Sequence, residues 1–326
     1  MATPSYKRIL VAIEFPGERT QTGLGKAVEI AKRTGARLIL MHAAFEPTVV
    51  TPFAFAPPVD RKKIVLVESK RALEKLAQGI RRKGLRATAR VEWDYPSPDA
   101  IVRAGRREKA DLVVAESHRR SRGARLFLTN TDWQLIRVCP IPLLFVKSAR
   151  HYGAARVLAA VDPLHAYAKP AGLDARILDA GRQLADACRG KLAAVHAYLP
   201  LSVQMPDSVG MPYVVPVAPD VERDYEKRLR RMLARLSNTR NVKEDDQYLL
   251  IGDSASAISD LARKLRADIV VMGAVSRSGL GRLFIGSTAE RVIDRLNCDV
   301  LVIKPRGFRT PVARRVSAKQ LYLAPL

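Results

Sequence analysis

The sequence predicts an α/β protein built from two tandem copies of one domain, each with a five-stranded, mostly parallel sheet and helices on both faces. Three observations lead to this prediction. Strand-like and helix-like stretches alternate along the chain, the second half repeats the first in register, and the strand-like runs are short and unbroken rather than alternating in polarity. Alternation of strands and helices is typical of βαβ units. Unbroken aliphatic runs are typical of parallel strands that are buried on both faces.

The repeat can be read directly from the residues. Residues 110–147 align without a gap on residues 267–304, at an offset of 157, and 13 of the 38 positions are identical. The two halves also begin alike, with KRILVAIE at residues 7–14 and ARVLAAVD at residues 155–162. We therefore expect domains at residues 1–148 and 154–305, joined by a short linker and followed by a basic tail. The tail, residues 306–326, has no acidic residue, and we expect it to pack loosely.

Each half supplies five strand-like runs. They lie at residues 9–13, 38–43, 87–92, 111–115 and 142–146, and again at residues 157–161, 192–197, 248–251, 268–272 and 300–303. Helix-like stretches fall between them, among them residues 24–33, 62–82, 175–188, 221–236 and 257–265. Ser254 and Ser287 stand where helix N-caps are expected. The last strands of the halves are expected to pair within the chain, giving an internal pseudo-dimer and a monomer or weak homodimer.

Two proline-rich stretches, residues 46–59 and 199–219, interrupt this order after the second strand of each half. Both are apolar and long for connections in a compact domain. We expect them to cover the sheet edge or the contact between the halves. The alternative is that they form the walls of an apolar ligand cavity.

The charge is unusually positive, with 56 Lys and Arg against 32 Asp and Glu, a net charge of +24. Eleven basic and two acidic residues lie between positions 61 and 90. A field of this sign attracts polyanions such as RNA. A solvated basic surface without such a partner is the alternative, since no nucleic-acid motif accompanies the charge.

Several classes of protein are disfavoured by the composition. No run approaches the roughly 18 apolar residues of a membrane span, and the first residues do not read as a signal peptide. Three scattered cysteines indicate neither a disulfide framework nor a zinc site, so we expect a cytoplasmic protein. The five histidines show no metal-ligand spacing, and no nucleophile arrangement is evident, so we expect neither a metal nor an enzyme.

The second half carries a glycine-rich loop, GAVSRSGLGRLFIGST, at residues 273–288. A strand, such a loop and the start of a helix form a phosphate-binding layout, because backbone N–H groups point at the anion. We expect Gly273 to let the chain leave the strand tightly, and Gly286 to let the backbone approach a phosphate. Asp162 follows the first strand of this half, where the carboxyl ends of parallel strands form a ligand crevice.

Gly273, Ser276 and the pair Gly286-Ser287 keep the spacing Gly, two residues, Gly, nine residues, Gly-Ser/Thr, with Ser276 at the middle glycine. Together with the stretches TDWQLIRVCP (residues 131–140), STAERVIDRLNCDVLVIKP (residues 287–305) and GFRTPV (residues 307–312), this spacing resembles tandem members of the universal stress protein family. The resemblance covers both halves of the chain.

This resemblance implies an adenine-nucleotide alpha hydrolase-like fold and a non-enzymatic, cytoplasmic stress-response protein that supports resistance to DNA damage. It also implies ATP or a related nucleotide as the ligand of the second half. The implied contacts with ATP are Ala160, Val161, Asp162, Ala197, Met272, Gly273, Ser276, Gly286, Ser287 and Thr288.

The first half departs from the motif. Glu116, Arg119 and Thr129 replace the three glycines, and Glu14 replaces the aspartate. A carboxylate repels phosphate, so we expect no ATP there. Two other functions stay open at this point, a basic RNA-associated module and a carrier of a lipid-like or nucleotide-sugar ligand.

Overall fold

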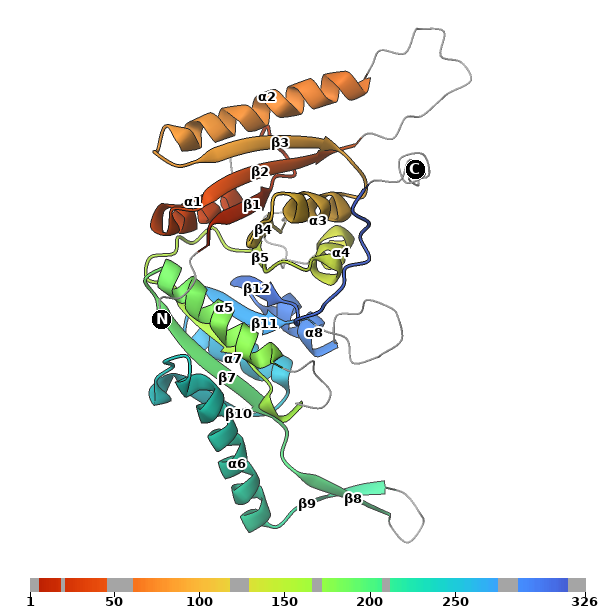
Figure 1. The fold of residues 1–326 in the computed structure, drawn as a ribbon. Helices are drawn as coiled ribbons and strands as arrows, with labels where there is room; N and C mark the ends of the chain where they lie inside the picture. The colour runs from red at the N-terminus through yellow and green to blue at the C-terminus, as the bar shows by residue number, and fades with distance from the viewer. Residues whose placement is uncertain are drawn as a thin grey trace.

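The computed structural model contains one ten-stranded sheet, with the strand order β10-β7-β6-β11-β12-β5-β4-β1-β2-β3 (Figure 1). The structure describes residues 6–18, 21–45, 61–117, 129–165, 172–206, 212–274 and 287–315. Each half contributes five consecutive strands of this order. Within each half all neighbouring strands are parallel.

The strands lie close to their predicted positions. Those of the first half are β1 (Arg8–Ala12), β2 (Arg37–Ala44), β3 (Ala87–Trp93), β4 (Leu112–Glu116) and β5 (Leu143–Val146). Those of the second half are β6 (Arg156–Ala160), β7 (Lys191–Tyr198), β10 (Gln247–Ile251), β11 (Ile269–Gly273) and β12 (Asp299–Ile303). The α/β fold class and the mostly parallel strands are therefore confirmed.

The halves join through their last strands. β5 and β12 pair antiparallel, with Leu144 opposite Leu301, and both side chains are fully buried. This confirms that the last strands pair within the chain. It also corrects the expectation of two separate sheets, because the apolar edge of each five-stranded sheet is covered by the other one.

Helices cover both faces of the sheet. One face carries α1 (Thr22–Thr34), α2 (Arg61–Arg81), α5 (Leu173–Ala187) and α6 (Pro219–Asn238), and the other carries α3 (Ser97–Arg107), α4 (Asn130–Val138), α7 (Ser254–Lys264) and α8 (Ser287–Arg295). Two short 3-10 helices are η1 (Pro163–His165) and η2 (Glu244–Asp246). In β1, Ile9 and Val11 pack on the first layer and Leu10 packs on the second. Burial on both faces explains why the strands are aliphatic throughout.

Helix α7 begins one residue from the predicted cap. Its N-cap is Asp253, whose carboxylate accepts the N–H of Ser256 at 3.1 Å, so Ser254 is already the first helical residue. Aspartate and serine cap helices about equally well, and the sequence alone did not distinguish them. Ser287 opens α8, and the residue before it lies outside the described ranges.

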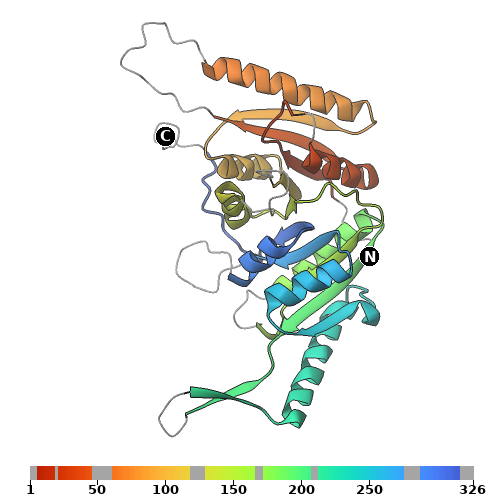
Figure 2. The same cartoon turned by 180° about the vertical axis from the view of Figure 1, so that it is seen from behind.

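The second proline-rich stretch contains an antiparallel hairpin, β8 (Ser202–Pro206) and β9 (Pro212–Pro216). The hairpin projects from the end of the molecule beyond α6, far from the β5–β12 junction in both views (Figures 1 and 2). For these residues the expected cover over the contact between the halves is wrong. The first proline-rich stretch, residues 46–59, lies outside the described ranges.

A buried polar network fixes the linker between the halves. The carboxylate of Asp299, at the start of β12, accepts the backbone N–H groups of Lys147 and Ser148 at 2.8 Å. The same carboxylate lies 3.2 Å from Nζ of Lys26 on α1 and accepts the hydroxyl of Tyr152 at 2.5 Å. Because these groups come from both halves, the network ties the halves together at the amino end of β12.

Residues 306–315 run along α3 and α4 of the first half (Figure 1). Val312 is buried in the same apolar cluster as α3 and α4, and Arg106 donates to its carbonyl at 3.1 Å. The segment is therefore anchored at Val312, while most of residues 306–315 are exposed. Residues 316–326 lie outside the described ranges.

Candidate functional site

The predicted ligand residues of the second half gather at the carboxyl edge of three adjacent strands, β7, β6 and β11. In the register of these strands Ala159 lies opposite Val271, and Ala160 lies opposite Val195. Asp162, three residues after Ala159, and Gly273, two residues after Val271, therefore leave the sheet at the same edge. Ligands of open α/β sheets bind at such an edge.

Asp162 has a fixed backbone and an accessible side chain. Its N–H donates to Oδ1 of Asp174, in the first turn of α5, at 3.0 Å. Its carboxylate is 27% exposed and lies 3.8 Å from Nδ1 of His196. The geometry leaves a carboxylate at the sheet edge that is able to accept a hydrogen bond from a ligand hydroxyl or amine.

His196 and its counterpart His42 support the ends of the first strands. Nδ1 of His196 lies 3.1 Å from the carbonyl of Val161, and Nδ1 of His42 lies 2.9 Å from the carbonyl of Ile13. Each ring donates from Nδ1 when its proton is on that nitrogen. Burial lowers the pKa of His42 below its usual range. The two histidines therefore make equivalent contacts in the two halves.

The structure gives Gly273 a different role from the expected one. Gly273 is the last residue of β11 and does not have a left-handed φ. A Cβ at this position would lie 2.9 Å from Cδ2 of Leu173 and 3.3 Å from Cδ1 of Ile177. The close packing of α5 on the strand end therefore favours glycine here, and a left-handed backbone does not.

At the matching position of the first half, Glu116 ends β4 and meets the start of α1. Its Oε2 accepts the N–H of Gly23 at 2.9 Å. The carboxylate thus satisfies a free N–H group in the first turn of α1, where negative charge is favourable. Its location also supports the expectation that this half does not hold a phosphate at this point.

At the ends of β4 and β11, the small residue of the strand–helix contact lies on different elements. It lies on the helix in the first half and on the strand in the second half. The first half pairs a large strand residue, Glu116, with Gly23, and the second half pairs Gly273 with Leu173. The glycine-to-glutamate departure in the first half is therefore also a packing substitution.

Thr129, the third departure, is a helix cap. Its hydroxyl accepts the N–H of Asp132 at 3.2 Å, and the carboxylate of Asp132 accepts the N–H of Thr129 at 2.8 Å. This reciprocal capping box starts α4. Arg119 lies outside the described ranges.

The remaining predicted residues divide into three groups. Ala160 and Ala197 are partly buried at the strand ends, while the side chain of Met272 is buried in the core. Ser287 and Thr288 open α8, and Thr288 is exposed. Ser276 and Gly286 lie outside the described ranges.

Comparison with known proteins agrees with this architecture. The sequence model of the universal stress protein family matches residues 5–147 and again residues 154–304. The chain belongs to the universal stress protein family. Membership gives it a role in the stress response.

Full-length relatives include universal stress protein E of Photorhabdus laumondii, 27% identical over 318 residues that cover 94% of this chain and 98% of the relative. Universal stress protein E of Escherichia coli K12 is 27% identical over 316 residues, covering 94% and 96% of the two chains. A solved protein of unknown function from Pseudomonas aeruginosa PAO1 superposes with a TM-score of 0.68 at 26% identity, covering 92% of this chain and 93% of that one. Similarity to both halves identifies this chain as a tandem member of the family.

Aromatic side chains that the sequence did not reveal lie beside Asp162 in this universal stress protein. The ring of Tyr198 stacks 6.5 Å from that of His196, and Tyr225 on α6 meets Tyr198 edge-on at 5.8 Å. Burial raises the pKa of Tyr225 above its usual range, and the nearby charge of Asp162 adds to the shift. Tyr225 is distant in sequence, and no local motif marks it.

The described part of this family member shows neither a metal-binding group of His, Cys, Asp or Glu nor a helix suited to cross a bilayer. Its three cysteines are free, and Cys139 and Cys188 are buried. Burial raises the pKa of the Cys139 thiol to about 12, so the thiol is protonated at neutral pH. Cys139 and Cys188 therefore serve as small buried hydrophobic residues.

Proposed function

We propose that the second half binds ATP or a related nucleotide at the carboxyl edge of β7, β6 and β11. The protein acts there as a binding protein of the cytoplasmic stress response, including resistance to DNA damage, and not as an enzyme. The observation that carries this proposal is the convergence of Asp162 and Gly273 on adjacent strands, next to a loop that keeps the spacing of the family motif. Family membership of both halves supports the stress role.

The described residues fit the nucleoside end of ATP. The exposed part of the Asp162 carboxylate accepts hydrogen bonds from ribose hydroxyls, and the small side chains of Ala160 and Ala197 leave room above the strand ends. The phosphates are assigned to Gly273, Ser276, Gly286, Ser287 and Thr288, on the spacing of the loop and the start of α8. Val161, directly after β6, and Met272, near the end of β11, complete the proposed set.

Calorimetric titration with ATP tests this site. We expect Asp162→Asn to lower the affinity about tenfold, because a charge-assisted hydrogen bond is weakened. Glu14→Gln changes the matching carboxylate of the first half and should leave the affinity unchanged. Gly286→Asp places a carboxylate in the phosphate loop and should abolish binding.

Two results would contradict the site. The first is an absence of ATP binding by the natural protein. The second is an equal loss of affinity in Asp162→Asn and Glu14→Gln. Survival of a deletion strain after DNA damage, complemented with either the natural chain or Gly286→Asp, then tests whether binding supports the stress role.

A further inference from the structure

Helix α6 carries its inward-facing side chains past the part of the protein that it covers. Val221, Tyr225, Leu229 and Leu233 follow one another at a spacing of four residues and share one face of the helix. Leu229 and Leu233 are buried, whereas Val221 is 47% exposed and Tyr225 is partly exposed. In Figure 1 the start of α6 lies beside the β8–β9 hairpin. The inward face of α6 is therefore covered from Leu229 onward and only partly covered at Tyr225.

Tyr225 lies over the carboxyl edge of the sheet, next to Asp162. Helix α6 packs against η1, which directly follows Asp162. Tyr225 meets Tyr198 edge-on at 5.8 Å, Tyr198 stacks 6.5 Å from His196, and Nδ1 of His196 lies 3.8 Å from the Asp162 carboxylate. These contacts form a continuous row of side chains from the carboxylate to α6.

Tyr225 is the ring of this row that a ligand is able to reach. His196 and Tyr198 are only 3% and 5% exposed. Tyr225 keeps part of its surface open to solvent. Packing against Tyr198 alone would be served equally well by a leucine, the residue that continues the same face of α6 at position 229. A flat ring at the edge of the crevice adds the ability to stack on a second flat group.

The first half has no aromatic residue at the matching place. In α6 the first buried residue is Leu229, and Tyr225 stands one turn before it. In α2 the first buried residue is Leu73, and the residue one turn before it is Ser69. The ring therefore belongs to the half that keeps the predicted ligand residues, and it is not a general feature of the repeated fold.

The strand order sets the direction in which a nucleotide would lie. β6, which leads to Asp162, lies between β7 and β11. With the ribose at Asp162 and the phosphates at Gly273, the end of β11, the base falls on the side of β7. Ala197 near the end of β7, and Tyr225 in contact with the last residue of that strand, lie on this side.

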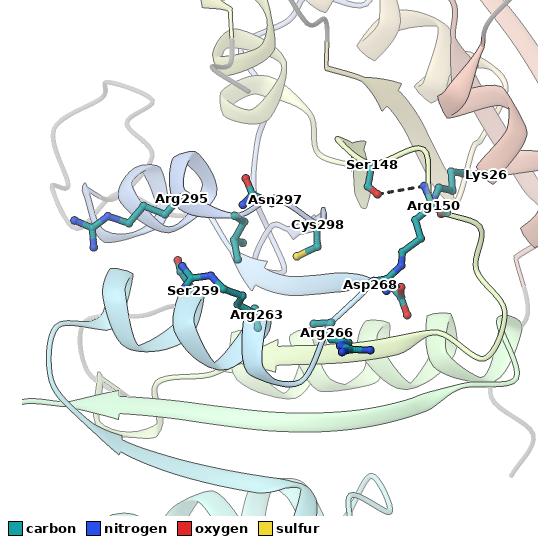
Figure 3. A pocket seen from close by; sticks show the side chains of 13 residues that line it. Lys26, Ser148, Arg150, Ser259, Arg263, Arg266, Asp268, Arg295, Asn297 and Cys298 are labelled. Carbon is teal, nitrogen blue, oxygen red and sulfur yellow. Dashed lines mark hydrogen bonds and ion pairs between the residues drawn. The ribbon is translucent and has the colours of Figure 1, made fainter. Parts of the chain in front are cut away.

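A hollow of about 220 Å³ lies at the opposite edge of the second half, at the amino ends of β11 and β12 (Figure 3). Arg150 at its rim lies 3.5 Å from Asp268, and Arg263 lies 3.0 Å from Asp260. Figure 3 also marks the hydrogen bond from the N–H of Arg150 to the hydroxyl of Ser148, at 3.2 Å. The lining, as far as the structure describes it, contains no aromatic side chain. A base would therefore find a stacking partner at the carboxyl edge and not in this hollow.

We propose that Tyr225 stacks on the base of the bound nucleotide and makes the site selective for a ligand with a flat aromatic group. This inference rests on the proposed nucleotide site, and it names the part of the ligand that α6 recognises. Stacking of a base on an aromatic side chain tolerates different bases, because every base has a π-face. The phosphate end of the ligand does not depend on Tyr225.

Titration of the full chain with ATP, at about 0.15 M salt to screen the general charge, tests this role. Tyr225→Leu keeps an apolar side chain against Tyr198 and removes the ring, so we expect the affinity to fall about tenfold. Tyr225→Phe keeps the ring. Within the described residues the hydroxyl of Tyr225 has no hydrogen-bond partner, so this variant should bind like the natural protein.

Tyr248→Leu is the matched control, because it removes a partly buried ring of the same half that packs in the opposite helix layer. It should leave the affinity for ATP unchanged. Inorganic tripolyphosphate is the second probe, since it has the phosphates of ATP and no base. Tyr225→Leu should not weaken its binding, whereas a general disturbance of the site would weaken both ligands.

Three results would overturn the role of Tyr225 and leave the nucleotide site in place. They are unchanged binding of ATP by Tyr225→Leu, an equal loss in Tyr225→Leu and Tyr248→Leu, and an equal loss of ATP and tripolyphosphate. Failure of the natural protein to bind ATP would overturn both proposals. Thermal unfolding of each variant verifies that it is folded at the temperature of the titration.

Discussion

At the residue scale, one glycine shows how closely the two halves are matched in their packing. Gly273 ends β11 against Leu173 and Ile177, while its counterpart Glu116 ends β4 against Gly23. Interiors are packed too densely to accept bulk on both sides of such a contact. A substitution at the strand end therefore has to be read together with the helix that covers it.

We predict that Gly273→Ala lowers the free energy of unfolding by about 1–3 kcal/mol, because the new Cβ would lie 2.9 Å from Cδ2 of Leu173. Adding Leu173→Ala to Gly273→Ala should lower the free energy of unfolding by less than Leu173→Ala does in the natural chain. Denaturant unfolding of the four proteins in a double-mutant cycle measures the coupling. Strictly additive effects would show that the two side chains do not compete for space.

The sequence was sufficient for several residues of the candidate site and insufficient for others. Asp162 and Gly273 were predicted to meet because parallel strands end at one edge, and the register agrees. The contact of Gly273 with Leu173 was not predicted, since it depends on the depth at which α5 packs. Tyr225 was missed for the same reason, because it reaches the site from α6.

At the element scale, the strands were the most predictable part of the fold. Short aliphatic runs are typical of buried parallel strands, so these strands could be located from the sequence. The hairpin of β8 and β9 was missed because a proline ends β8 and prolines begin and end β9, a pattern typical of a loop. The C-terminal segment was missed because its burial depends on Val312, one apolar residue among several basic ones.

We predict that Val312→Ala lowers the free energy of unfolding by about 2 kcal/mol, since two buried methylene equivalents are lost from the surface of α3 and α4. Arg309→Ala, an exposed position of the same segment, should change stability little. Chemical denaturation measures both. An equal, small effect of the two variants would mean that the segment does not contribute to the first half.

At the scale of the whole molecule, the sheet and the Asp299 network make the two halves one structure. The internal pairing of the last strands followed from the repeat, whereas the network did not, because Lys26, Tyr152 and Asp299 come from distant segments.

We predict that Asp299→Asn destabilises the protein by about 3–5 kcal/mol, because Lys26 is left buried without its counter-charge. Lys26→Met should recover part of this loss in the double variant. Both tryptophans, Trp93 and Trp133, lie in the first half, so fluorescence follows that half and circular dichroism follows the whole chain. We expect the unfolding transitions from the two probes to coincide in the natural protein and to separate in Asp299→Asn. An unchanged unfolding midpoint in Asp299→Asn would contradict this prediction.

The buried Asp299 network also bears on why two copies are fused in one chain. In a dimer of identical subunits with a twofold axis, both subunits contribute the same residues to the interface. Every substitution therefore appears twice in that interface. Here Asp299 corresponds to Pro142 at the offset of 157, and the network is built once. Because the two halves belong to one chain, the residues on the two sides of the junction need not be identical. One side has a charge, its counterpart has a proline, and a substitution in one half leaves the matching position of the other half unchanged.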